Sequence, residues 1–76
     1  MTPRQVVDYL ERSGIPKKDL ADRLGITESA VYFWLKQGWI AHERQCQIQL
    51  ELRGSGLRAN WDDVPDDKRP LAERAA

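Results

Sequence analysis

Long apolar segments, cysteines and histidines are scarce in this sequence of 76 residues. The longest unbroken apolar run, Ala30 to Leu35, has six residues and is far too short to cross a membrane. The single cysteine, Cys46, cannot form an internal disulfide, which is typical of a reducing cytoplasm. Cys46 and the single histidine, His42, are too few for a metal site or a catalytic centre. We therefore expect a cytoplasmic protein that is not an enzyme and uses no cofactor, metal, membrane or small-molecule ligand.

An excess of positive charge is missing as well. The sequence has 12 Lys and Arg residues against 12 Asp and Glu residues, so its formal net charge is zero. A strongly basic balance is the usual electrostatic footprint of a nucleic-acid-binding protein. Taken alone, the neutral charge therefore argues mildly against nucleic acid as a partner. The length allows one small domain, and 41% hydrophobic residues with 32% charged ones are an ordinary globular mixture.

Capping residues and glycines divide the first half of the sequence into short helices. Thr2 and Thr27 are good N-cap residues, and Pro3 suits the first position of a helix. Glycine commonly ends a helix because it adopts a positive φ without strain. We therefore expect three helices, which run from Pro3 to Gly14, over about 17–24 with Gly25 at the end, and over 27–37 with Gly38 at the end.

The segment after Gly38 fits two different structures. Residues 45–53 alternate strictly between polar and apolar, and a glycine turn and a second alternating stretch follow, which predicts a β-hairpin. Ala41, Gln45, Ile48 and Leu52 also fall at helical spacing, which predicts a fourth helix. Periodicity alone leaves both structures open. Residues 66–76 offer almost nothing to bury, and we expect them to be a disordered tail.

The helix expected over residues 27–37 has an unusual outer face. At 100° per residue, Val31, Trp34 and Leu35 point inward. The outward patch then holds two aromatic residues, Tyr32 and Phe33, where a solvent-facing surface would carry charges. Either ring could instead pack against the C-terminal segment.

The sequence of residues 17–36 resembles the helix-turn-helix of phage Cro and repressor proteins. Lys-Lys-Asp-Leu-Ala-Asp-Arg-Leu-Gly-Ile, followed by Thr-Glu-Ser-Ala-Val-Tyr-Phe-Trp, matches their Ala, Gly, Val/Ile and Trp pattern. The resemblance covers about residues 3–65. It implies a helix-turn-helix DNA-binding domain over residues 1–65, followed by the tail.

The resemblance also bears on the choice between a β-hairpin and a fourth helix for the segment after Gly38. Some Cro proteins are all-α, with four to five helices in an arrangement like that of lambda repressor, and others are α+β, with a β-hairpin after three helices. Ile40-Ala41 followed by Glu43-Arg44-Gln45 resembles the opening of the fourth helix in the all-helical members. We favour the all-α fold on this ground.

Because the family binds DNA, the resemblance implies roles for individual residues of this chain. The third helix would enter the major groove of double-stranded DNA, and the residues implied to read bases are Glu28, Ser29, Tyr32 and Phe33. The residues implied to contact phosphates are Lys17, Lys18, Thr27, Lys36 and Arg44.

The function implied is that of a sequence-specific transcriptional repressor encoded by a phage or prophage and acting in the bacterial cytoplasm. One short helix reads only a few base pairs, so a homodimer is expected on operator DNA. We place its dimerisation segment at residues 41–64, with Leu50, Leu57 and Trp61 as contacts. The alternative is a protein–protein interaction adaptor on the same scaffold, with Tyr32, Phe33 and Trp39 as an apolar docking patch.

Overall fold

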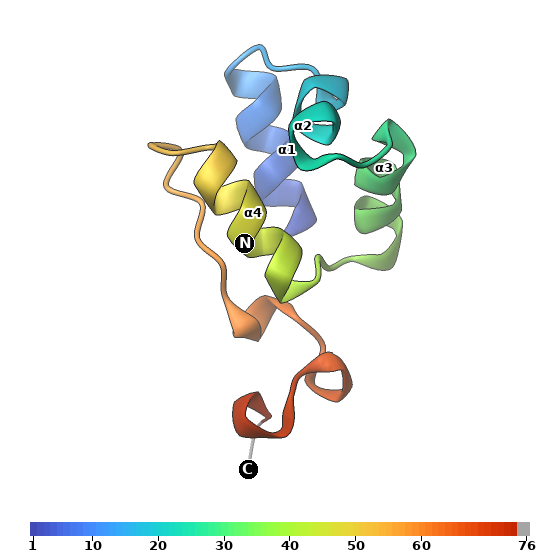
Figure 1. Ribbon diagram of the computed structural model, residues 1–76, viewed down its shortest axis with the longest axis vertical. Coiled ribbons are helices and arrows are strands. Elements are labelled where there is room, and N and C mark those ends of the chain that lie inside the picture. Colours follow the sequence, from blue (N-terminus) through green and yellow to red (C-terminus); the bar gives the residue numbers. More distant parts are fainter. Residues whose placement is uncertain (75–76) are drawn as a thin grey trace.

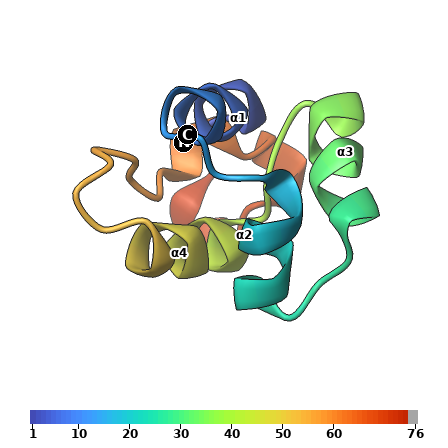
Figure 2. The same ribbon diagram turned by 90° about the horizontal axis from the view of Figure 1, so that it is seen from above.

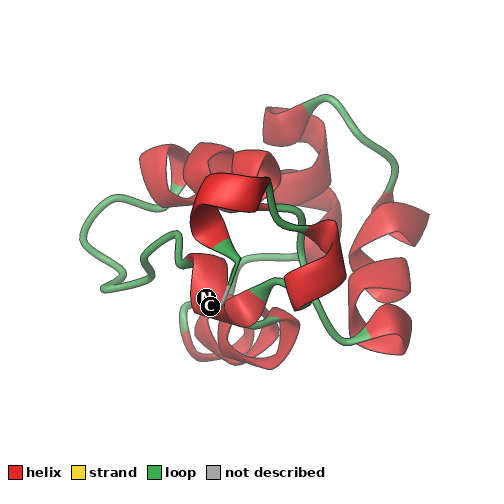
Figure 3. Cartoon of the chain, turned by 90° about the horizontal axis from the view of Figure 1, so that it is seen from below, coloured by secondary structure: helices red, strands yellow, loops and turns green. Residues whose placement is uncertain are grey.

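Helices and loops make up the whole of residues 1–74, the part of the chain that the computed structural model describes (Figure 1). Figure 3 shows helices and loops and no strand in this range. The all-α fold is therefore confirmed, and the β-hairpin alternative is wrong. The four α-helices are α1 (Pro3–Arg12), α2 (Lys17–Leu24), α3 (Glu28–Gln37) and α4 (His42–Glu51), and three short 3-10 helices follow at Trp61–Asp63, Asp66–Lys68 and Leu71–Glu73.

The helix boundaries follow the capping chemistry of the sequence. At the start of α1, the Thr2 hydroxyl accepts a hydrogen bond from the backbone N–H of Gln5 (3.2 Å). The Gln5 side chain accepts one in return from the N–H of Thr2 (2.8 Å), which forms a capping box. Gly25 and Gly38 end α2 and α3 with φ values of +69° and +90°, a conformation that costs other residues free energy.

Burial explains why residues 42–51 form α4 rather than a strand. A strand would place Cys46, Ile48 and Leu50 on one face. In the structure Ile48 is fully buried, whereas Cys46 and Leu50 are exposed. The buried set is instead Gln45, Ile48 and Leu52, which recurs at helical spacing. The alternation misleads because Gln45 is polar at a core position, while Cys46 and Leu50 are apolar at exposed ones.

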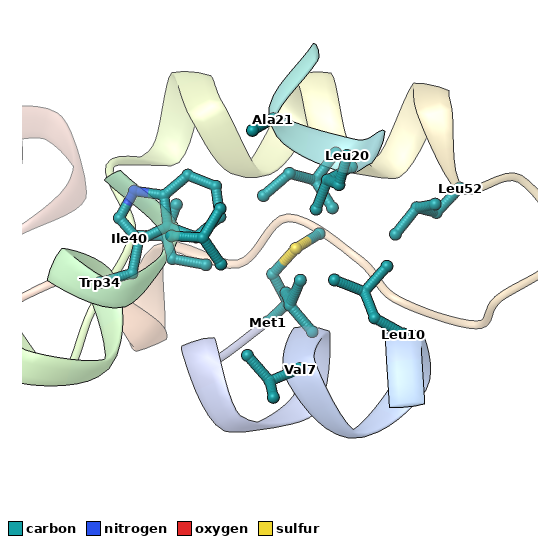
Figure 4. Close-up of a cluster of buried hydrophobic side chains, with 11 residues drawn as sticks. Met1, Val7, Leu10, Leu20, Ala21, Trp34, Ile40 and Leu52 are labelled. Atoms are coloured by element: carbon teal, nitrogen blue, oxygen red, sulfur yellow. The ribbon is translucent and has the colours of Figure 1, made fainter. Parts of the chain in front are cut away.

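The core lies where the four helices face one another (Figure 2). The Met1 side chain lies beside α1 and points toward Leu20 of α2, with Leu10 and Leu52 close by (Figure 4). Trp34 closes the core on the side of α3. The buried apolar residues of this cluster are Met1, Val6, Val7, Leu10, Leu20, Ala21, Val31, Trp34, Ile40, Ile48 and Leu52.

A hydrogen-bonded junction around Gln45 joins distant parts of the chain inside this core. The Gln45 side chain, which has no exposed surface, donates to the Ile40 carbonyl (2.8 Å). Its Oε1 accepts from the amino group of Met1 (3.0 Å) and from the N–H of Asn60 (2.9 Å). The same amino group lies 2.9 Å from a carboxylate oxygen of Asp63. The junction therefore fixes the start of α1, the α3–α4 connection and residues 58–63 to one another.

Residues 66–74 differ from the disordered tail predicted from the sequence. They form two 3-10 turns, and the Arg69 side chain donates to the carbonyls of Val64 (2.7 Å) and Asp62 (3.4 Å). Val64 is itself 2% exposed. Backbone hydrogen bonds within the two turns and side-chain to backbone hydrogen bonds, rather than apolar burial, give this segment its conformation. The rest of the predicted tail, residues 75–76, lies outside the described residues.

No helix in residues 1–74 has the length and apolar character required to span a membrane.

The Gln45 junction predicts a large effect of a single substitution. Gln45→Ala would leave the buried Ile40 carbonyl and the partly buried Asn60 N–H without their partner, so we expect a loss of about 2–4 kcal/mol in the free energy of unfolding. Gln47→Ala, on the exposed face of the same helix, should cost less than about 1 kcal/mol. Urea denaturation followed by circular dichroism measures both. Equal losses for the two variants would contradict the role given to the junction.

Candidate nucleic-acid interface

A tight glycine turn sets α3 against α2. Gly25 allows the chain to reverse after α2, and the N–H of Ile26 donates back to the Ala21 carbonyl (3.0 Å). Ala21 is 1% exposed, and Val31 of α3 is fully buried. A small residue on α2 and a β-branched residue on α3 thus let the two helices pack closely. This turn and its buried contacts fix the direction in which α3 presents its outer face.

The two faces of α3 differ sharply in exposure. Val31 and Trp34 are buried, with Trp34 at 7%. Tyr32 is 52% exposed and Phe33 is 57% exposed, so neither ring is covered by the C-terminal segment. Figure 2 shows α3 at one side of the molecule, with its outer face turned away from α4. The four residues predicted to read bases are all exposed on α3: Glu28, Ser29, Tyr32 and Phe33.

The start of α2 lies beside this face. The Nζ of Lys17 lies 5.8 Å from the centre of the Tyr32 ring, which is within the range of a cation–π contact. The same Nζ is 3.9 Å from a carboxylate oxygen of Glu11 on α1. Lys18 is exposed next to it, and Lys36 is exposed in the last turn of α3. The start of α2 therefore adjoins the exposed face of α3 through the contact of Lys17 with Tyr32.

Thr27 occupies the N-cap position of α3 but does not cap it. Its backbone is extended, as the position requires, yet its hydroxyl makes no capping hydrogen bond. The start of α2 is similar, because its N-cap residue is Pro16, which has no side-chain donor or acceptor. Both helices of the motif therefore begin with uncapped N–H groups and the partial positive charge of a helix start. Such ends suit the phosphate contacts predicted for Lys17, Lys18 and Thr27.

Arg44 differs from the other predicted phosphate contacts. It is half-buried, and its Nη1 donates to Gln47 Oε1 (2.6 Å) and to the Leu24 carbonyl at the end of α2 (3.4 Å). The guanidinium therefore helps to attach α4 to α2. The structure does not bring Arg44 into the group formed by Lys17 and the α3 face.

The three predicted dimer contacts lie in three different environments. Leu50 is 61% exposed on α4. Leu57 is partly buried and packs against the core. Trp61 stacks on His42 with ring centres 3.9 Å apart and planes 5° apart. Only Leu50 presents most of its side chain to solvent, so the three do not form a single patch.

Acidic, cysteine and histidine side chains do not gather into a metal site. The Cys46 Sγ lies 3.7 Å from Nδ1 of His42, but no group of three or more such ligands occurs in residues 1–74. A hollow of about 730 Å³ lies between α1 and residues 55–60. Its walls mix acidic Asp8 and Glu11 with basic Arg12 and Arg58, so no single charge favours a particular ligand.

Two structural contacts of this region escaped prediction from the sequence. Glu11, in the last turn of α1, lies near Lys17, the first residue of α2, because the connection between the two helices is only four residues long. The Arg44 contact with Leu24 joins residues that are 20 positions apart. The first depends on the path of the loop and the second on tertiary packing, and periodicity and capping rules describe neither.

Comparisons of this chain with family models, with curated proteins and with solved structures found no match. Functional inference therefore rests on the α2–turn–α3 geometry and on the residues that this geometry exposes.

Truncation of two neighbouring side chains of α3, Phe33 and Trp34, should change the free energy of unfolding by very different amounts. Trp34→Ala removes a buried ring and should lower the free energy of unfolding by about 3–5 kcal/mol. Phe33→Ala removes a ring that is 57% exposed, and we expect a cost below about 1 kcal/mol. Thermal unfolding of the two variants measures the difference. A comparable loss for Phe33→Ala would mean that its ring belongs to the core and not to an interface.

Proposed function

We propose that this protein is a sequence-specific repressor of the phage Cro type that binds double-stranded operator DNA through α3 in the major groove. The observation that carries the proposal is the division of α3 into a buried face and an exposed face. An α-helix fits the major groove, and a helix of ten residues is about 15 Å long, which allows it to contact a few base pairs. The protein would act in the cytoplasm of the bacterial host by occupying its operator, without chemistry of its own.

The side chains on the exposed face suit base reading. Glu28 can accept a hydrogen bond from the N4 amino group of cytosine, and Ser29 can contact several bases. The Tyr32 and Phe33 rings suit the methyl group of thymine. More than half of each side chain is exposed, so packing inside the protein does not account for two aromatic residues on this face.

The placement of charge supports DNA binding in spite of the neutral total. Lys17 and Lys18 lie at the start of α2, where the uncapped N–H groups add partial positive charge. Lys36 stands at the other end of α3. A chain with a net charge of zero gains little from general attraction to phosphates. Specific binding would then depend on base contacts and on two copies binding half-sites about 34 Å apart.

Substitutions on the α3 face should change which sequences are bound. Selection from random DNA would first define the preferred site of the wild-type protein. Ser29→Ala or Glu28→Ala should then reduce discrimination at one position by about 1–3 kcal/mol, because a base-edge contact is lost. Competition binding with single-base variants of the site measures this. An equal loss of affinity for every DNA sequence would count against the groove assignment.

Substitution of Lys18 should weaken binding to all sequences alike. Lys18→Ala should also lower the slope of log affinity against log salt concentration by about 1, since one phosphate contact is lost. Arg53→Ala is the matched control, because Arg53 is an exposed cation just after α4. The end of α4 lies on the side of the molecule opposite α3 (Figure 2). Fluorescence anisotropy over a salt series measures both slopes. The same change for Arg53→Ala would show a non-specific charge effect.

The alternative function, a protein-binding adaptor, is favoured by one observation. Tyr32 and Phe33 together expose an aromatic patch of the kind found at the centre of protein interfaces. An adaptor would show no selected DNA motif and no dependence of DNA affinity on Lys18. The two experiments above therefore separate the two functions.

A further inference from the structure

Glu28 is an unusual residue for a surface that faces DNA. It is exposed in the first turn of α3, and its carboxylate forms no ion pair or hydrogen bond within residues 1–74. The phosphates of DNA repel a carboxylate, so its presence in the proposed interface requires a compensating hydrogen-bond donor. Because a carboxylate only accepts hydrogen bonds, its partner in the major groove must be the exocyclic amino group of cytosine or of adenine.

The ring of Tyr32 lies next to Glu28 on the same face of α3. Residues four positions apart are neighbours on a helix, with Cβ atoms roughly 5–6 Å apart. Helical side chains also lean toward the N-terminal end of the helix, so Tyr32 leans toward Glu28. The Nζ of Lys17 lies 5.8 Å from the centre of the ring and restricts its position, while the side chain stays 52% exposed. The face therefore presents a hydrogen-bond acceptor and an apolar ring side by side.

None of the four unmodified bases satisfies both of these side chains at once. Guanine offers two acceptors to the major groove, and thymine carries the acceptor O4 beside its C5 methyl group. Adenine has an amino group, but the ring would leave its neighbouring acceptor N7 without a partner. Cytosine has an amino group at C4 and only a hydrogen atom at C5. Cytosine therefore suits Glu28 and lacks the methyl group that would fill the contact with Tyr32.

We infer that the α3 face binds 5-methylcytosine, with the Glu28 carboxylate accepting from N4 and the Tyr32 ring packed against the C5 methyl group. Unlike the four unmodified bases, 5-methylcytosine presents an amino donor and a methyl group on adjacent atoms of its major-groove edge. Phe33, the next residue of α3, keeps the thymine contact proposed above. The inference rests on the proposed function, and it makes cytosine methylation a chemical modification that raises binding to the operator.

Synthetic DNA with one modified base tests the methyl contact. Selection from random unmethylated DNA should give a site with a cytosine at the position that is sensitive to Glu28→Ala. A methyl group on C5 of that cytosine should tighten binding of the wild-type protein about fourfold, the ratio expected for burial of one methyl group. Fluorescence anisotropy measures the affinities of the two sites, which differ only in this group. Equal affinities would overturn the inference.

Variants of the two aromatic residues test which ring contacts the methyl group. Tyr32→Ala should bind the methylated and the unmethylated site equally, while Tyr32→Phe retains the ring and should keep the difference of about fourfold. Phe33→Ala is the matched control, because it removes the neighbouring exposed ring and should keep this ratio whatever its overall affinity. Circular dichroism should show the wild-type helix content in all three. A ratio that survives Tyr32→Ala, or disappears in Phe33→Ala, would overturn the inference.

Comparison of 5-methylcytosine with thymine at the same position tests the role of Glu28. Both bases carry the C5 methyl group, but at C4 one has an amino donor and the other has the acceptor O4. The wild-type protein should therefore prefer 5-methylcytosine by at least about tenfold. Glu28→Ala should bring the two affinities close together, because the group that distinguishes them is gone. A preference that Glu28→Ala leaves unchanged would overturn the inference.

These measurements separate failure of the inference from failure of the proposed function. If selection returns no preferred DNA sequence, the proposed function is wrong, and the inference falls with it. A preferred site without a cytosine that is sensitive to Glu28→Ala would overturn only the inference. The same holds for a site that is indifferent to methylation but loses affinity when a neighbouring thymine is replaced by uracil, because Tyr32 would then contact the next base pair.

Discussion

The buried side chain of Gln45 is the interaction on which the rest of the fold depends. A polar group without exposed surface is costly unless its hydrogen-bonding atoms are satisfied. Gln45 meets this condition by donating to the Ile40 carbonyl and accepting from the Met1 amino group and the Asn60 N–H. These partners come from the start of the chain, from the α3–α4 connection and from the segment after α4. The junction therefore acts as an internal cross-link, in a domain too small for a large apolar core.

The same junction explains why α3 can carry an exposed aromatic face. Ile40, just beyond α3, is held both by its buried side chain and by the hydrogen bond from Gln45 to its carbonyl. At its other end α3 is held by the glycine turn after Ala21. With both ends fixed and Trp34 packed inward, Tyr32 is free to remain exposed without loosening the helix. A rigid element that presents a few side chains is what recognition of a groove requires.

Local rules predicted the part of the structure that local interactions determine. Thr2, Gly25 and Gly38 mark helix boundaries because capping and positive φ are properties of one or two residues. The inward and outward faces of α3 also follow from periodicity alone. The secondary structure of residues 45–53 does not follow from periodicity, because Gln45 is polar in the sequence and buried in the fold. One of its hydrogen-bond partners, Met1, is 44 residues away. Where a buried polar residue is satisfied by distant groups, alternation of polar and apolar residues is misleading.

The positions of the charged residues determine how strongly a chain with zero net charge would attract phosphates. Glu11 lies near Lys17, so part of the positive charge at the start of α2 is offset by the neighbouring helix. Attraction to phosphates would then be weak for one copy, and selectivity would come from contacts that only the correct bases can make. Two DNA-binding domains held at a fixed spacing would bind more tightly than one, because after the first has bound, the second is at a high effective concentration near its half-site. For the proposed repressor, a chain without net charge would therefore depend on paired, base-selective contacts more than on general attraction to phosphates.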